Sequence, residues 1–293
     1  MTVDRRIIDL YNEYVHTALP RREFMTRLAS IAGSTAAAMA ILPFIEPNYA
    51  QARQVEPDDK RLKTEKIEFA GPQGAVKAYV AMPRKLGKNE KVSGVLVIHE
   101  NRGLNEHIED VARRAAVGGY IAIAPDGLSV AGGAPGDQEA ARDLFAKQDP
   151  ARIAGDVLAA VPWLKKHSQC NGKTGSVGFC YGGGLALRAA IETPAVDAAV
   201  CFYGRQLTAD ETQRLKVPVL LNYAGSDERI NAGIPEFRAA LDAVGVPYSL
   251  NMYPGTQHGF HNDASSARYN EPAAKLAWSR TMDFFATYLK QQR

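Results

Sequence analysis

The sequence predicts an α/β fold with a mostly parallel central sheet, an N-terminal hairpin and helices on both faces of the sheet. Three observations lead to this prediction. Segments 64–70 and 75–83 have strand character and are joined through a short turn that contains glycine, as in a hairpin. Beyond the hairpin, strand-like runs alternate with helical patterns. These runs are continuously apolar, which is typical of parallel strands buried on both faces.

The elements are expected in the following order. After the hairpin, strands are predicted at 93–100, 120–126, 172–179, 196–204, 217–225 and 247–255. Helices are predicted from 105 to about 118 and at 138–147, 151–166, 181–192, 234–245 and 271–289. Asn105 is a suitable N-cap for the first of these helices, because its side chain can accept a hydrogen bond from the first turn.

Charge and cysteine content exclude several classes of protein. The chain has 293 residues and a formal net charge of +3, with the two signs interspersed. Because no block of Lys and Arg is present, we expect no nucleic-acid partner. Cys170, Cys180 and Cys201 are too few and too irregularly spaced for a disulfide scaffold or a zinc site, although a Cys170–Cys201 pair stays open.

The first 52 residues differ in character from the rest. Arg21 and Arg22 precede Phe24, and a moderately apolar, alanine-rich run covers 28–44. Two small residues follow at the spacing that a signal peptidase recognises, at Ala50 and Ala52. The segment resembles a twin-arginine export signal.

This resemblance predicts three parts and a location. Residues 1–52 would be the signal, 53–62 a charged linker and 63–293 the α/β domain of a periplasmic protein. No stable membrane span is expected once the signal is removed, since the apolar run is short. The alternatives are an ordinary amphipathic helix that packs on the domain, an N-terminal anchor, or a cytoplasmic protein.

Functional groups of an open α/β sheet gather at the carboxyl ends of its strands. The side chains predicted at that edge are His99, Glu100, Asp126, Cys180, Tyr203, Asp227 and His258.

Cys180 is the candidate nucleophile. Gly178, Cys180 and Gly182 fit the G-x-S-x-G elbow with cysteine in place of serine, between a predicted strand and a predicted helix. Glycines on both sides let strand and helix approach closely, and the start of the helix favours the thiolate. The alternative is a buried cysteine that only fills the core.

A histidine and an acid follow in the chain order that an α/β-hydrolase requires. His258 is the predicted base, and His261 is its rival. Asp227 is predicted to orient the imidazole of His258, in preference to Glu228. The H-x-x-H spacing of the two histidines has no further ligand cluster beside it, so no metal is expected.

Two backbone N–H groups are predicted to bind the oxyanion of a tetrahedral intermediate. They belong to Asn101, which follows the strand at 93–100, and to Tyr181, which follows the nucleophile.

Six short motifs carry a resemblance to a known family. They are "HENRG", "APD", "GFCYGG", "FYG", "AGSDE" and "QHGF", in this order. The chain resembles the dienelactone hydrolases (carboxymethylenebutenolidases) from about Lys63 to Gln291. This resemblance implies a Cys180, Asp227 and His258 triad, with Glu100 in contact with the resting thiol as its proton acceptor. It also implies hydrolysis of a small ester or lactone through a thioester, with no cofactor.

The sequence departs from the family at the residues that bind the substrate. Two arginines with which dienelactone hydrolases hold a substrate carboxylate are absent here, where 127–130 and 260–263 carry other residues. Arg102 or Arg205 could supply a cation from another direction, and Tyr203 is a further candidate contact. A neutral or differently charged ester or lactone is therefore an equal expectation. The sequence does not predict the oligomeric state.

Two other functions stay open at this point. One is a non-catalytic binding protein on a hydrolase scaffold, and the other is a peptidase or acyl-peptide hydrolase.

Overall fold

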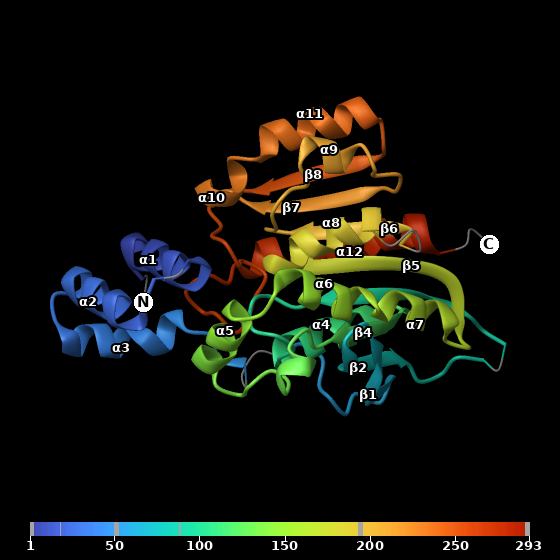
Figure 1. Cartoon of the computed structure of the whole chain (residues 1–293), viewed down its shortest axis with the longest axis horizontal. Coiled ribbons are helices and arrows are strands. Elements are labelled where there is room, and N and C mark those ends of the chain that lie inside the picture. The colour runs from blue at the N-terminus through green and yellow to red at the C-terminus, as the bar shows by residue number, and fades with distance from the viewer. Residues whose placement is uncertain (1–2, 18, 50–52, 88, 193–195, 291–293) are drawn as a thin grey trace.

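A single mixed sheet forms the centre of the protein (Figure 1). The computed structural model describes residues 3–17, 19–49, 53–87, 89–192 and 196–290. Within these residues the sheet has eight strands in the order β1-β2-β4-β3-β5-β6-β7-β8. The crossovers of this order are typical of an α/β protein, so the predicted fold class is confirmed.

The hairpin lies at one edge of the sheet. β1 (Leu62–Gly71) pairs antiparallel with β2 (Gly74–Pro83), and Gly71 is opposite Gly74. β2 is also antiparallel to β4 (Ile121–Pro125). The other neighbouring strands pair in parallel. They are β3 (Val92–Ile98), β5 (Cys170–Phe179), β6 (Ala198–Phe202), β7 (Val219–Ala224) and β8 (Tyr248–Tyr253).

Helices cover both faces of the sheet because alternate side chains of each strand point to opposite faces. Val95 and Val97 of β3 pack in one apolar cluster with α4 (Glu106–Val117) and α12 (Glu271–Leu289). Leu96 and Ile98 pack in a second cluster. The helices of that cluster are α6 (Pro150–Leu158), α7 (Ala160–Lys166) and α8 (Tyr181–Glu192). Beyond them, α11 (Ile234–Val244) covers β6 and β7.

Most predicted elements are found close to their expected ends. Asn105 caps α4, since its side chain accepts a hydrogen bond from the backbone N–H of Ile108 at 3.1 Å. The helix expected at 151–166 is instead two helices, because α6 ends and α7 begins around Ala159. Four short elements lie in the loops at the strand ends. They are η2 (Ser129–Ala131), α5 (Gln138–Ala146), α9 (Ala209–Thr212) and α10 (Glu228–Asn231).

The N-terminal segment forms three helices with an apolar cluster of their own. These are α1 (Arg5–His16), α2 (Arg21–Ala32) and α3 (Thr35–Ile45), drawn in blue in Figure 1. Phe24 and Leu28 of α2 are completely buried in this cluster. Ala50 and Ala52 of the predicted cleavage site lie outside the described residues.

In the described part of the chain, no single helix has the length and apolar character needed to cross a membrane. α2 and α3 reach that composition only when taken together, and the chain bends by 107° between them.

Polar contacts fasten α1 and α2 to the α/β domain beside α5. The carboxylate of Glu139 accepts a hydrogen bond from the hydroxyl of Tyr14 and pairs with Arg21 at 2.5 Å. The guanidinium of Arg142 lies 3.9 Å from the centre of the Tyr14 ring. The side-chain amide of Asn101 donates to the carbonyl of Val15 at 2.7 Å. α1 is thereby held at the edge of the sheet where the strands end.

Candidate active site

Cys180 lies in a strained turn between β5 and α8. Its φ of 55° is in the left-handed region, which costs energy for any residue other than glycine. The turn also requires its neighbouring glycines. A Cβ at Gly178 would lie 1.8 Å from the carbonyl oxygen of Gly182, and one at Gly182 would lie 2.5 Å from that of His99. The local sequence therefore forces the sulfur out of the sheet and toward the loops, as in a nucleophile elbow.

The start of α8 places positive charge next to the sulfur. Tyr181 is the first residue of α8, and the free N–H groups of a helix start carry partial positive charge. Among the described residues, the backbone N–H groups of Tyr181 and Asn101 have no protein acceptor. Both predicted oxyanion donors are therefore available to a ligand.

His258 and Asp227 form a buried pair. Nδ1 of His258 donates a hydrogen bond to Oδ2 of Asp227 at 2.5 Å. Burial disfavours the charge on His258, but the negative sulfur of Cys180 and the carboxylate of Asp227 outweigh it and raise the pKa of His258 to about 9. Burial by itself would raise the pKa of Asp227, but the hydrogen bond from His258 and the charge on its ring hold that pKa below its usual value.

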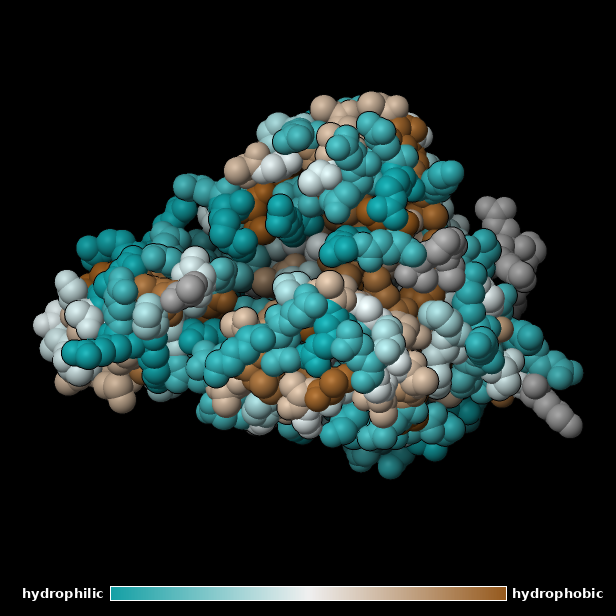
Figure 2. Space-filling view, viewed as in Figure 1, coloured by the Kyte–Doolittle hydropathy of each residue, from teal (hydrophilic) through white to brown (hydrophobic). Residues whose placement is uncertain are grey.

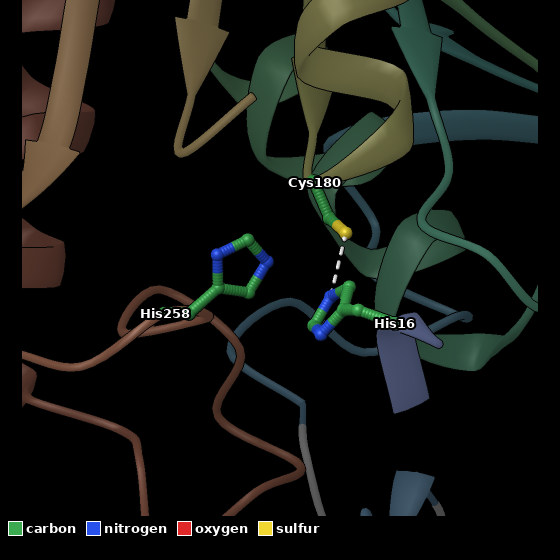
Figure 3. A group of neighbouring side chains, drawn as sticks. All are labelled: His16, Cys180 and His258. Carbon is green, nitrogen blue, oxygen red and sulfur yellow. Dashed lines mark hydrogen bonds between the residues drawn. The ribbon is translucent and has the colours of Figure 1, made fainter. Parts of the chain in front are cut away.

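The structure separates the two rival histidines. The ring of His261 stacks on Phe179 at a centroid distance of 4.9 Å. Among the described residues, neither of its ring nitrogens has a hydrogen-bond partner. Burial, followed by the charge of Arg114, holds the pKa of His261 well below its ordinary value. His261 is therefore a neutral core residue, and His258 is the imidazole that faces the sulfur (Figure 3).

Among the described residues, Glu100 makes no hydrogen bond to the sulfur of Cys180, although the resemblance implied a contact between them. Its Oε2 accepts a hydrogen bond from the side-chain amide of Asn262 at 2.7 Å. The sulfur of Cys180 instead has the imidazole of His16 beside it, with Nε2 at 3.2 Å from Sγ (Figure 3). An imidazole from α1 has replaced the expected carboxylate as the partner of the thiol.

His16 is the residue of the candidate site that the sequence did not reveal. It is the last residue of α1, in the segment interpreted as an export signal. Burial, followed by the positive charge of His258 and Arg229, holds the pKa of His16 well below its ordinary value, so the ring is neutral. No motif surrounds it, and its closeness to Cys180 exists only because α1 docks on the domain.

A cavity of about 1020 Å³ opens in front of Cys180 and His258. Its walls come partly from the N-terminal segment, through Val15 and His16 of α1 and Leu19 of the connection to α2. Figure 2 shows the surface hollowed between these helices and the rest of the molecule. The segment therefore forms part of the wall of the candidate site.

The three remaining candidate contacts differ in their access to the cavity. Tyr203 lines it, and the Tyr203 ring packs against His258 at a centroid distance of 5.0 Å. Arg205 lines it too, with an exposed guanidinium that has no partner among the described residues. Arg102 is buried and donates a hydrogen bond to the hydroxyl of Tyr11 in α1 at 3.3 Å. Arg205 is therefore the better placed of the two arginines for a ligand.

Two polar residues at the sheet edge organise loops. Asp126 accepts hydrogen bonds from the backbone N–H groups of Leu104, Leu128 and Ala134. His99 accepts one from the N–H of Gly127 at 3.1 Å.

Cys170 and Cys201 are buried free thiols, so they do not form the disulfide that the sequence left open.

The parallel sheet and the cysteine elbow define an α/β-hydrolase. The sequence model of the dienelactone hydrolase family matches residues 76–289. The chain belongs to this family.

Named relatives agree with this assignment. A "Putative carboxymethylenebutenolidase" of Methylorubrum extorquens is 31% identical over 286 residues, which cover 92% of this chain and 96% of the relative. Another protein of that name, from Saccharolobus solfataricus, is 33% identical over 259 residues, covering 75% of this chain and 97% of its own. The crystal structure of a "Putative Dienelactone Hydrolase" from Klebsiella pneumoniae superposes with a TM-score of 0.69 at 28% identity, covering 78% of this chain and 99% of that one.

The first of these matches extends into the N-terminal helices. The match covers 92% of this chain and so leaves out 8% of it. The first 52 of the 293 residues are more than 8% of the chain, so the match must include some of them. Part of the segment that holds α1 to α3 is therefore similar in the relative from Methylorubrum extorquens.

Proposed function

We propose that this protein is a cysteine-dependent hydrolase of esters or lactones that works through a thioester acyl-enzyme. The observation that carries the proposal is the placement of Cys180, at the strained end of β5, opposite the buried His258–Asp227 pair. A thiolate at a helix start beside an imidazole is an activated nucleophile. Membership of a hydrolase family supports the same chemistry.

The proposed reaction has two halves. The thiolate of Cys180 attacks the carbonyl carbon, and the N–H groups of Asn101 and Tyr181 stabilise the oxyanion. The C–O bond to the alcohol then breaks, and the alcohol takes a proton from the His258 imidazolium, which leaves a thioester. In the second half, His258 removes a proton from water as the water attacks the thioester, and the C–S bond breaks to release the acid and the thiolate. The thiolate and the His258 imidazolium are thereby restored. Asp227 keeps the His258 ring in one tautomer throughout.

The cavity favours an ester or lactone with an anionic group. Arg205 presents an unpaired guanidinium at the cavity wall, and a guanidinium binds a carboxylate through two parallel hydrogen bonds. We propose that Arg205 takes the part that two other arginines play in the dienelactone hydrolases.

The test is turnover of p-nitrophenyl acetate and of a carboxylated counterpart, the succinate monoester. We expect both to be hydrolysed, with acylated Cys180 detected by mass spectrometry. Cys180→Ala should lower kcat by about 10⁴-fold or more, and Asp227→Asn by about 10²- to 10⁴-fold. Arg205→Ala should raise KM for the succinate only, and Lys216→Ala, exposed outside the cavity, should leave both substrates unaffected.

Two results would remove the proposal. Undiminished turnover in Cys180→Ala would exclude the cysteine mechanism. No turnover of any ester or lactone in a broad panel would favour the non-catalytic binding protein.

Export remains a proposal with its own test. If residues 1–52 are an export signal, protein recovered from the periplasm begins near Arg53 and lacks His16. Intact protein in the cytoplasm that begins at Met1 or Thr2 would favour the alternative in which the segment packs on the domain. The docking of α1 beside α5 supports that alternative.

A further inference from the structure

Three side chains from distant parts of the chain line the cavity and lie next to one another (Figure 3). His16 comes from α1, Cys180 from the elbow and His258 from the loop after β8. Each offers one atom that can bind a metal, and these atoms all lie within 4.8 Å of one another. The two imidazole rings are 4.5 Å apart between centroids and nearly perpendicular, at 77°.

Hydrogen bonds fix which nitrogen of each ring faces the sulfur. Nδ1 of His16 is 2.7 Å from the carbonyl oxygen of Asn12. A carbonyl only accepts, so Nδ1 carries the proton and Nε2 presents a lone pair toward Sγ. Nδ1 of His258 likewise donates to Asp227, which leaves Nε2 as the ring nitrogen available to the sulfur or to an ion. Histidines that bind metals are oriented in this way, by a carbonyl or a carboxylate on the far nitrogen.

The three donors also need something positive between them. A lone pair of His16 that faces the lone pairs of the sulfur at 3.2 Å is repelled unless a proton or a cation lies between the two atoms. A catalytic thiol does not need a second imidazole, because His258 and Asp227 already supply a complete base. The proposed hydrolysis therefore has no step that uses His16.

We propose that His16, Cys180 and His258 form a binding site for Zn²⁺, with the fourth coordination position open to the cavity. One thiolate and two imidazoles are ligands that Zn²⁺ prefers in tetrahedral sites. Tetrahedral geometry with ordinary Zn–N and Zn–S bonds sets neighbouring donor atoms about 3.5 Å apart. The observed separations, 3.2 Å for one pair and no more than 4.8 Å for the others, need only small side-chain rotations.

Zinc at this site would inhibit the proposed hydrolysis. The ion displaces the proton that Cys180 and His258 hold between them, this proton leaves to solvent, and no electrons are transferred. The sulfur then no longer attacks a carbonyl, and α1 is tied to the elbow through His16. This consequence rests on the proposed function, whereas binding itself does not.

Binding is tested on the full-length chain, freed of metal by a chelator. Zn²⁺ is titrated against a chromophoric chelator, and Co²⁺ is added in parallel because a cobalt–thiolate bond gives a charge-transfer band. We expect one ion per chain, a band that disappears in Cys180→Ser, and affinity at least about tenfold weaker in His16→Ala and His16→Gln. His167→Ala and Cys170→Ala, which remove a histidine and a cysteine outside the site, should bind as the wild type does.

His16→Gln keeps a polar side chain of similar length, so it separates loss of a ligand from loss of α1 packing, which circular dichroism monitors in each variant. The proposal is overturned if the wild type binds no Zn²⁺ up to millimolar concentration. It is also overturned if both His16 variants bind as tightly as the wild type, which would indicate an adventitious ion only.

Ester turnover separates this inference from the proposed function. We expect Zn²⁺ to inhibit the wild type, and inhibition of His16→Gln to need at least about tenfold more Zn²⁺. Turnover without zinc binding would remove the metal site and leave the hydrolase. Zinc binding at these three residues without turnover of any ester would do the reverse.

Discussion

At the scale of single residues, the site depends on charges that are buried together. The ring of His258 is almost fully buried, yet the charges of Cys180 and Asp227 keep it protonated. A histidine with a raised pKa stabilises the folded state at low pH, and this contribution is lost as pH rises. The pH dependence of stability therefore reports on the site without any substrate.

The first prediction concerns this dependence. The unfolded pKa of histidine is about 6.5, and the folded pKa of His258 is about 9. The stabilisation from His258 should be complete below the first value and should disappear as pH rises through the second. Denaturant unfolding of the wild type and of His258→Gln at a series of pH values measures it as a difference in free energy. A difference that grows between these two pH values would contradict the charge assignment.

At the scale of elements, the strand–elbow–helix unit explains both the strain and the glycines. β5 and α8 approach so closely that backbone atoms occupy the space of a side chain at Gly178. The left-handed φ of Cys180 is then imposed by the packing of the two elements, not by a preference of cysteine.

The second prediction is that Gly178→Ala unfolds or strongly destabilises the domain. Its Cβ would overlap the carbonyl of Gly182, a backbone atom that cannot move aside, so we expect a cost of about 3 kcal/mol or more. Gly136→Ala is the matched control, because nothing lies within 4 Å of a Cβ there. Thermal unfolding of both variants measures the effect. Equal melting temperatures for Gly178→Ala and Gly136→Ala would show that β5 and α8 are further apart than described.

At the scale of the whole molecule, the N-terminal helices decide how open the site is. Their apolar cluster is separate from the larger clusters that cover the sheet. The segment is joined to the domain mostly by polar contacts such as those of Tyr14 and Arg21. A small, separately packed unit opens at lower free energy than the core of the domain.

The third prediction is that Phe24→Ala exposes Cys180. Phe24 is fully buried among the N-terminal helices, and a Phe→Ala change in a core costs about 3 to 5 kcal/mol. Alkylation of Cys180 by iodoacetamide, followed by mass spectrometry, should accelerate by about tenfold or more. Met39→Ala is the control on the same helices, since that side chain is 56% exposed. Unchanged alkylation in Phe24→Ala would mean that the helices do not restrict access.

The sheet, its hairpin and the elbow could be predicted from the sequence. Apolar runs of strand length, the Gly71–Gly74 turn and the glycines around Cys180 are local patterns, and local patterns reflect local geometry. The pairing of Asp227 with His258 was also predictable, because both follow parallel strands that end at one edge. Even the choice between His258 and His261 could be made from their distance to the strand end.

The side chain next to the sulfur depends on how distant segments pack, and no local pattern predicts it. Glu100 was expected there, but its carboxylate is bonded to Asn262. His16 is 164 positions from Cys180 in the sequence. It lies on α1, in the N-terminal segment that resembles an export signal. Composition cannot distinguish an export signal that is cleaved off from an apolar segment that packs on the α/β domain. Both contain the same apolar side chains, and they differ only in the surface against which these side chains are buried.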